Sequence, residues 1–226
     1  MTSPSVASRS FAAAVSSLDH AAASVAGALV AQEQSIAIAE TSSGGEIAAS
    51  LLRLAGASAY FRGGVVCYSS QSKRELLRLS DAELGAAKSA TEDHAIILAA
   101  AVQNIMGSDW AIGETGVCGP TGNSRGMSPG HCCVGIVGPG GIAASLTINS
   151  HSANRAENMQ FFATAALELV QGKLGVTERS TLPGEAAPEL ISEDQALENF
   201  ESMLDQFRTD KSKGQKRPSD RARRPR

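Results

Sequence analysis

From residue 36 the chain runs Ile36-Ala37-Ile38-Ala39-Glu40-Thr41-Ser42-Ser43-Gly44-Gly45, and this stretch decides the fold. A short apolar run stops at hydroxyl residues and paired glycines, and a helical pattern follows over 46–54. This order is typical of a strand, a turn and a helix. The first turn of a helix presents backbone N–H groups and partial positive charge. We therefore expect the Gly44-Gly45 junction to hold an anion or an oxyanion.

A second strand and a second short helix are expected further along the chain. A second strand is expected over 65–69, and a short helix over 70–78 carries Lys73 before a loop near Ser80. The rest of the pattern predicts helices over 18–31, 91–105 and 154–170, strands over 110–113, 132–137 and 142–148, and an irregular loop over 119–130. Strands alternating with helices indicate an α/β fold, and the hairpin over 132–148 makes the sheet mixed.

Composition limits the classes of function. Aromatic residues make up 4% of the chain, so an aromatic cage or a base-stacking surface is not expected. The sequence lacks an apolar run of 18 residues, which predicts no membrane span. The four cysteines have no metal-type spacing and are expected to be reduced thiols. His94 has no ligand partner four residues on and is expected at the surface.

Charge divides the chain. Residues 208–226 carry nine Lys or Arg and two Asp, a net of +7, which leaves −10 for residues 1–207. We expect a disordered leader over 1–16, one domain over 17–176, and a linker, amphipathic helix and basic tail over 177–226. The basic tail has no aromatic residues, so we expect a solvated tail or a nuclear-import signal rather than a nucleic-acid contact.

Three motifs resemble those of the CinA C-terminal domain family, the nicotinamide mononucleotide amidohydrolases. Residues 39–45 are similar to A-E-S-C-T-G-G, residues 61–73 to F-x-G-G-V-V-x-Y-S/N-x-x-x-K, and residues 115–120 to T-G-I-A-G-P. The resemblance covers roughly residues 18–174. It implies a three-layer α/β/α sandwich, a homo-oligomer that is usually a dimer, a cytoplasmic enzyme, and hydrolysis of nicotinamide mononucleotide without a metal or organic cofactor. Mitochondrial targeting by the leader is a second possibility for location.

Amide hydrolysis needs a nucleophile, a proton acceptor and a site for the oxyanion. The resemblance implies that Thr41 is the nucleophile, with Tyr68 and Lys73 as proton relay and base; Ser42 is the alternative nucleophile. Strand alternation predicts that Thr41 and Ser42 do not both face the pocket. The residues implied in substrate binding are Glu40, Ser43, Gly44, Gly45, Thr115, Gly116, Gly119, Pro120 and Arg155.

The chain departs from the family pattern at the first motif. Thr41 replaces the family serine, and the added methyl restricts its side chain. A helix arginine of the family falls at Met159. These departures leave a second hypothesis, a catalytically silent member of the fold that binds a nucleotide in a regulatory or assembly role. Taken singly, the hydroxyls are ordinary helix caps and Lys73 an ordinary surface lysine; only the ordered set indicates a site.

Overall fold

The computed structural model describes the backbone of residues 6–175 and the side chains of residues 17–175. It holds a five-stranded sheet in the order β2-β1-β3-β4-β5. The strands are β1 (Ile36–Glu40), β2 (Phe61–Val66), β3 (Trp110–Val117), β4 (His131–Gly138) and β5 (Ile142–Asn149). β1 pairs in parallel with β2 and β3, whereas β3–β4 and β4–β5 are antiparallel. The predicted mixed sheet is confirmed.

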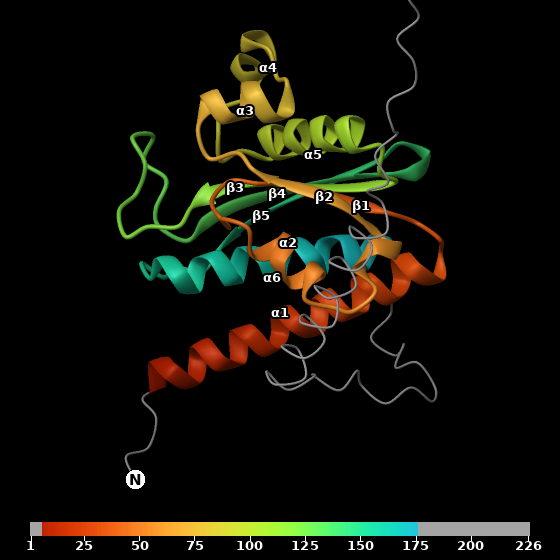
Figure 1. Cartoon of the computed structure of the whole chain (residues 1–226). Coiled ribbons are helices and arrows are strands. Elements are labelled where there is room, and N and C mark those ends of the chain that lie inside the picture. Colours follow the sequence, from red (N-terminus) through yellow and green to blue (C-terminus); the bar gives the residue numbers. More distant parts are fainter. Residues whose placement is uncertain (1–5, 176–226) are drawn as a thin grey trace, which may run out of the picture. The chain divides into compact units, whose positions relative to one another are not determined.

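Helices cover both faces of this sheet, as the predicted α/β/α sandwich requires (Figure 1). On one side lie α1 (Val6–Ala31), α2 (Glu46–Leu52) and α6 (Arg155–Lys173), with α1 packed against α6. On the other side lie α3 (Ser70–Leu77), α4 (Asp81–Ala86) and α5 (Glu92–Met106). Two short 3₁₀ turns, Ala57–Ala59 and Pro139–Gly141, precede β2 and β5. None of the described helices is both long and apolar enough to cross a bilayer.

Successive side chains of β1 point to opposite faces of the sheet and into two separate apolar cores. Ile36 and Ile38 face the core that α1, α2 and α6 cover, and Ala37 and Ala39 face the core beneath α5. All five residues of the strand are buried, as expected for a strand covered on both faces. Large side chains therefore fill one layer, and small ones let α5 lie close to the sheet in the other.

Several boundaries differ from the sequence prediction. The backbone is helical from Val6, so α1 takes in most of the segment expected to be a disordered leader. β2 covers 61–66 rather than 65–69, because Cys67 makes the last backbone bond to Glu40 and Ser69 is already the N-cap of α3. β3 runs to Val117, four residues further than predicted, since β4 pairs with it along that length.

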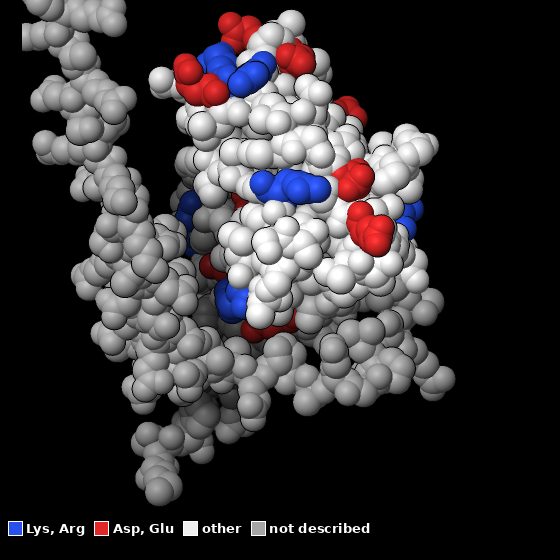
Figure 2. Space-filling view, turned by 45° about the vertical axis from the view of Figure 1, so that its right-hand side comes forward, with Lys and Arg blue, Asp and Glu red and all other residues white. Residues whose placement is uncertain are grey.

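A short helix replaces the loop expected near Ser80. Ser80 accepts a hydrogen bond from Glu83 N, and the Glu83 carboxylate accepts one from Ser80 N, which closes a capping box at the start of α4. Charged residues of both signs gather over α3 and α4, where Arg74 lies 2.6 Å from Asp81 (Figure 2). The predicted linker, amphipathic helix and basic tail, 177–226, lie outside the described residues.

Candidate active site

A cavity of about 420 Å³ opens at the carboxyl ends of the parallel strands β1 to β3. Ligands of α/β proteins commonly bind at this edge of the sheet. The segments that line it are the turn after β1, the connection from β2 into α3, the residues before α5, the end of β3 with the loop that follows, and the first residue of α6. Eight predicted residues are brought together in its wall: Thr41, Ser42, Tyr68, Lys73, Thr115, Gly116, Gly119 and Arg155.

The buried Glu40 carboxylate occupies the N-terminus of α2. It accepts hydrogen bonds from the backbone N–H groups of Gly45 (2.9 Å), Ile47 (3.2 Å) and Ala48 (2.9 Å). Burial raises the pKa of Glu40, and these hydrogen bonds oppose the shift. The prediction that the Gly44-Gly45 junction holds an external anion is therefore wrong, because the chain supplies its own carboxylate there.

Five residues predicted to bind substrate are not in the cavity wall: Glu40, Ser43, Gly44, Gly45 and Pro120. Ser43 is fully buried, and its hydroxyl oxygen lies within hydrogen-bond distance of both Glu40 (2.7 Å) and Glu114 (2.8 Å). Gly44 adopts a left-handed φ of 68°, and a Cβ there would lie 2.7 Å from Met159 Cε. Glu40, Ser43, Gly44 and Gly45 shape the turn after β1, whereas Pro120 lies on the loop after β3.

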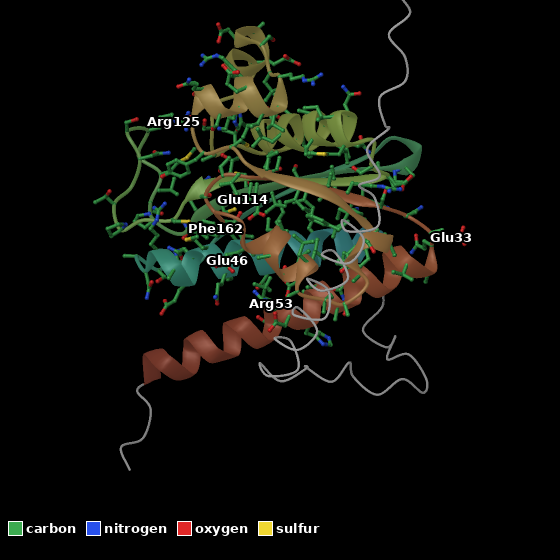
Figure 3. All side chains as sticks on the ribbon, viewed as in Figure 1. Glu33, Glu46, Arg53, Glu114, Arg125 and Phe162 are labelled. Carbon is green, nitrogen blue, oxygen red and sulfur yellow. The ribbon has the colours of Figure 1, made fainter. Side chains whose placement is uncertain are left out.

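Sequence reasoning missed Arg125 and His94, which are described below, and it also missed Glu114 on β3. Its carboxylate accepts hydrogen bonds from Thr41 N (3.0 Å), Ser43 N (2.9 Å) and the two serine hydroxyls of the turn. Figure 3 places Glu114 in the interior, beside the sheet. A carboxylate within a strand covered on both faces must be hydrogen-bonded, so its position in the run Ala111-Ile112-Gly113-Glu114 was the available signal.

Thr41 and Ser42 both line the cavity, contrary to the predicted alternation. The residues lie in bends after the end of β1, where strand geometry no longer holds. Their hydroxyls differ in one respect. Ser42 donates to Glu114 Oε1, whereas the Thr41 hydroxyl has no hydrogen-bond partner among the described residues.

Lys73 in the cavity wall forms a buried pair with His94, which lies behind it. Lys73 is 4% exposed and His94 is 1% exposed, with Lys73 Nζ 3.0 Å from His94 Nε2. The prediction of a surface His94 is wrong: the first turn of α5 packs against α3, so its third residue points inward. Burial lowers the pKa of Lys73, and nearby Arg125 adds to this effect, whereas Cys67 and Glu114 oppose it.

Two arginines add positive charge to the cavity. Arg155 donates to the Gly119 carbonyl (3.0 Å) and lies 3.5 Å from the hydroxyl of Tyr68, which is 65% exposed. Arg125 stands on the loop after β3 and donates to the Ser89 carbonyl (Figure 3). No carboxylate is among the described residues that line the cavity. The wall thus favours an anionic ligand.

A metal site is not evident in the described part of the chain, since no three His, Cys, Asp or Glu side chains are grouped to hold an ion.

The Cys118 thiol lines the cavity, and burial raises its pKa to about 12. That thiol donates to the Ser42 carbonyl at 3.0 Å. Its position agrees with a packing role rather than a nucleophilic one.

A family model for the CinA C-terminal domain matches residues 18–174. The chain belongs to the CinA C-terminal domain family. A CinA-like protein of Chlorobium limicola is 38% identical over 136 residues, which are 59% of this chain and 32% of the relative. One of Desulfosudis oleivorans is 32% identical over 146 residues, 65% of this chain and 35% of the relative. The match thus spans about a third of these curated relatives.

Solved structures of the CinA family share the fold. Competence damage-inducible protein A from Klebsiella pneumoniae superposes with a TM-score of 0.66 at 25% identity, covering 70% of this chain and 97% of that one. The competence/damage inducible protein from Agrobacterium tumefaciens superposes with a TM-score of 0.66 at 22% identity, covering 71% of this chain and 96% of that one. The resemblance drawn from the three motifs is confirmed.

Proposed function

We propose that this CinA-family domain hydrolyses the carboxamide of nicotinamide mononucleotide to give nicotinate mononucleotide and ammonia. One observation carries the proposal: a single cavity joins an unpartnered hydroxyl, a buried lysine of lowered pKa and two arginines, with no carboxylate among its described lining residues. The first two groups suit amide cleavage and the arginines suit a phosphate. The cavity volume also lies in the range that small-molecule ligands occupy.

In the proposed reaction the Thr41 hydroxyl oxygen attacks the carboxamide carbon. Its proton passes to the neutral amine of Lys73, and a tetrahedral intermediate forms. Lys73 then protonates the amide nitrogen, the C–N bond breaks and ammonia leaves. Water hydrolyses the Thr41 ester, again with Lys73 as the base, and releases the carboxylate product. Tyr68, exposed at the cavity mouth, relays protons between Lys73 and solvent.

A lysine can act as this base because burial has lowered its pKa. The amine form is then populated closer to neutral pH than it is for a lysine in water. Arg125 and Arg155 would bind the phosphate and hold the nicotinamide ring near Thr41. Charge-assisted contacts of this kind are roughly twice as strong as neutral hydrogen bonds.

The experiment is an ammonia-release assay on the full chain with nicotinamide mononucleotide, with the nicotinate product identified by mass. Lys73→Met is the control, because it keeps a buried side chain of similar length and removes the amine. We expect release by the parent and none by Lys73→Met at nearly equal melting temperature. No release by the parent protein at high enzyme concentration would refute the proposal.

The second candidate is a catalytically silent nucleotide-binding domain. Two observations favour it: threonine stands at the nucleophile position, and the neighbouring Ser42 hydroxyl is already bonded to Glu114. Calorimetric titration with nicotinamide mononucleotide separates the two functions. Tight binding without ammonia release would support the silent domain, and turnover would exclude it.

A further inference from the structure

The orientation of the His94 ring is fixed by a backbone carbonyl. His94 Nδ1 lies 3.1 Å from the Ala87 carbonyl oxygen, an atom that can only accept a hydrogen bond. Nδ1 therefore carries the ring proton. Burial, and then the charge of Lys73, lower the pKa of His94 to about 4. The imidazole is uncharged at neutral pH, so Nε2 has a free lone pair.

That lone pair is directed at Lys73. The Nε2 to Nζ distance is 3.0 Å, and an ammonium or an amine can donate across it. Among the residues that the structure describes, His94 is the one hydrogen-bond partner of Lys73 Nζ, and no carboxylate forms an ion pair with it. A lysine that is 4% exposed has thus been given a neutral acceptor.

The neutrality of the partner has a consequence for the chemistry. A carboxylate at hydrogen-bond distance would raise the pKa of Lys73 and keep it protonated, whereas a neutral imidazole orients the amine without adding negative charge. The charged or titratable groups that act on Lys73 are Cys67 after β2, Glu114 on β3 and Arg125 on the following loop. Among the described residues, only His94, from α5, contacts Nζ through a hydrogen bond.

We infer that His94 is a positioning residue for Lys73: its neutral ring, anchored on the Ala87 carbonyl, fixes Nζ at the cavity wall. The inference rests on the proposed function for its catalytic meaning, because Lys73 is the base of that reaction. The contact itself can be tested without turnover. His94 touches Lys73 and does not line the cavity, so its effect on a substrate is indirect.

The test compares two amide variants that mimic the two ring nitrogens separately. His94→Gln places an amide oxygen within reach of Lys73 Nζ. His94→Asn reaches only the Ala87 carbonyl side and leaves Nζ without an acceptor. Both variants remove the ring, so they differ mainly in the contact with Lys73. Melting temperatures of the two variants check that their folds are equivalent.

Two readouts separate positioning from packing. The first is the pKa of Lys73, measured from the pH dependence of its acylation by a small anhydride and read by peptide mass. It should fall in His94→Asn, since the lost hydrogen bond is strongest to the ammonium form. The second is kcat, which should fall about 10²-fold in His94→Asn, as for a misplaced catalytic group, with little change in KM. His94→Gln should restore most of both.

Nitrogen NMR of the parent protein supplies an independent measurement. We expect the tautomer with hydrogen on Nδ1 and no titration of His94 near neutral pH. The inference fails if the proton is on Nε2, or if the Asn and Gln variants agree in the pKa of Lys73 and in kcat. If His94→Asn does not melt cooperatively, the tautomer of His94 in the parent protein decides whether the inference holds. If the parent protein releases no ammonia, the proposed function fails. The acylation and NMR measurements still show whether His94 accepts a hydrogen bond from Lys73.

Discussion

At the scale of single residues, the choice of nucleophile depends on which hydroxyl is free. The Thr41 hydroxyl has no partner among the described residues, whereas that of Ser42 is bonded to Glu114. A hydroxyl that already donates to a buried carboxylate is held away from substrate unless the turn moves. The sequence match to the family serine selects the same residue, Thr41.

We predict that Thr41→Val, which keeps the shape of the side chain, lowers kcat by on the order of 10³. Thr41→Ser should raise the rate, because it removes the methyl that restricts the hydroxyl. Ser42→Ala is the matched control and should keep turnover while losing stability. Kinetics of ammonia release check all three variants. Full activity in Thr41→Val together with loss in Ser42→Ala would move the nucleophile to Ser42.

Arg125 should determine whether the phosphate is recognised. In Arg125→Gln, kcat/KM for nicotinamide mononucleotide should fall at least about tenfold, the value of one charge-assisted hydrogen bond. The corresponding nucleoside lacks the phosphate and should be affected much less. Steady-state kinetics with both substrates measure the ratio. An equal fall for both would show that Arg125 acts by shaping its loop or through Lys73.

His94 should also make stability depend on pH. The pKa of His94 is lowered from 6.5, the ordinary value for histidine, to about 4 in the folded chain. A group with a depressed pKa binds its proton first in the unfolded chain, so folding free energy is lost as pH falls from 6.5 towards 4, by up to about 3 kcal/mol. Urea unfolding at each pH should show a shallower dependence in His94→Gln than in the parent. The exposed His20→Gln serves as the control for losing one histidine.

At the scale of secondary-structure elements, the close approach of α5 to the sheet depends on two glycines. Gly113 on β3 pairs with Gly135 on β4, and both lie beneath α5. A Cβ on Gly113 would lie 2.1 Å from the Ala95 carbonyl oxygen, and one on Gly135 would lie 2.5 Å from Ile96 N. Since those atoms belong to helix backbone, only a shift of α5 could make room. Such a shift would also move His94.

We predict that Gly113→Ala destabilises the fold by about 3 kcal/mol, at the upper end for overpacking. Gly27→Ala in α1 is the matched control, because nothing lies within 4 Å of its added methyl. That change should raise the free energy of unfolding by roughly 0.5–1 kcal/mol, because alanine has the higher helix propensity. Urea denaturation of both variants gives the two free energies. Equal stability of Gly113→Ala and the parent would mean that α5 tolerates the displacement.

At the scale of the whole molecule, the core of the described domain closes at the end of α6. Leu174 belongs to the apolar core, and its carbonyl accepts a hydrogen bond from Gln32 Nε2 at 3.0 Å. The last turn of α6 is thus tied to the connection between α1 and β1. Among the described residues, Leu174 is the last that belongs to this core.

A chain truncated after Thr177 should therefore remain soluble and melt cooperatively within a few degrees of the full chain. Differential scanning calorimetry and size-exclusion chromatography with light scattering test this. The light-scattering mass also shows whether the full and the truncated chain form the homo-oligomer that the family resemblance implies. Aggregation of the truncated chain, or a broad non-cooperative transition, would show that residues 178–226 cover part of the domain.

Local sequence determined the elements and their order. The strand beginning at Ile36, the helix over 91–105 and the hairpin over 132–148 are predicted elements that the structure contains, because their signals act over a few residues. Some errors came where a neighbouring strand sets the boundary, as in the extension of β3 to Val117 along β4. The helix α4 was missed although its capping box is a local signal. The three family motifs also gave seven of the residues in the cavity wall, and the wider resemblance gave Arg155.

Only the tertiary structure decided how the charged groups are used. Glu114 is 71 to 73 residues from the hydroxyl turn that it holds, and His94 is 21 residues from Lys73. No local pattern reports such distances, since the pairing follows from β1 lying beside β3 and α3 packing on α5. The same holds for the N-terminus of α2, which looks free in sequence and is filled by Glu40. Burial and hydrogen bonding of these side chains are set by packing, and packing exists only once the chain has folded.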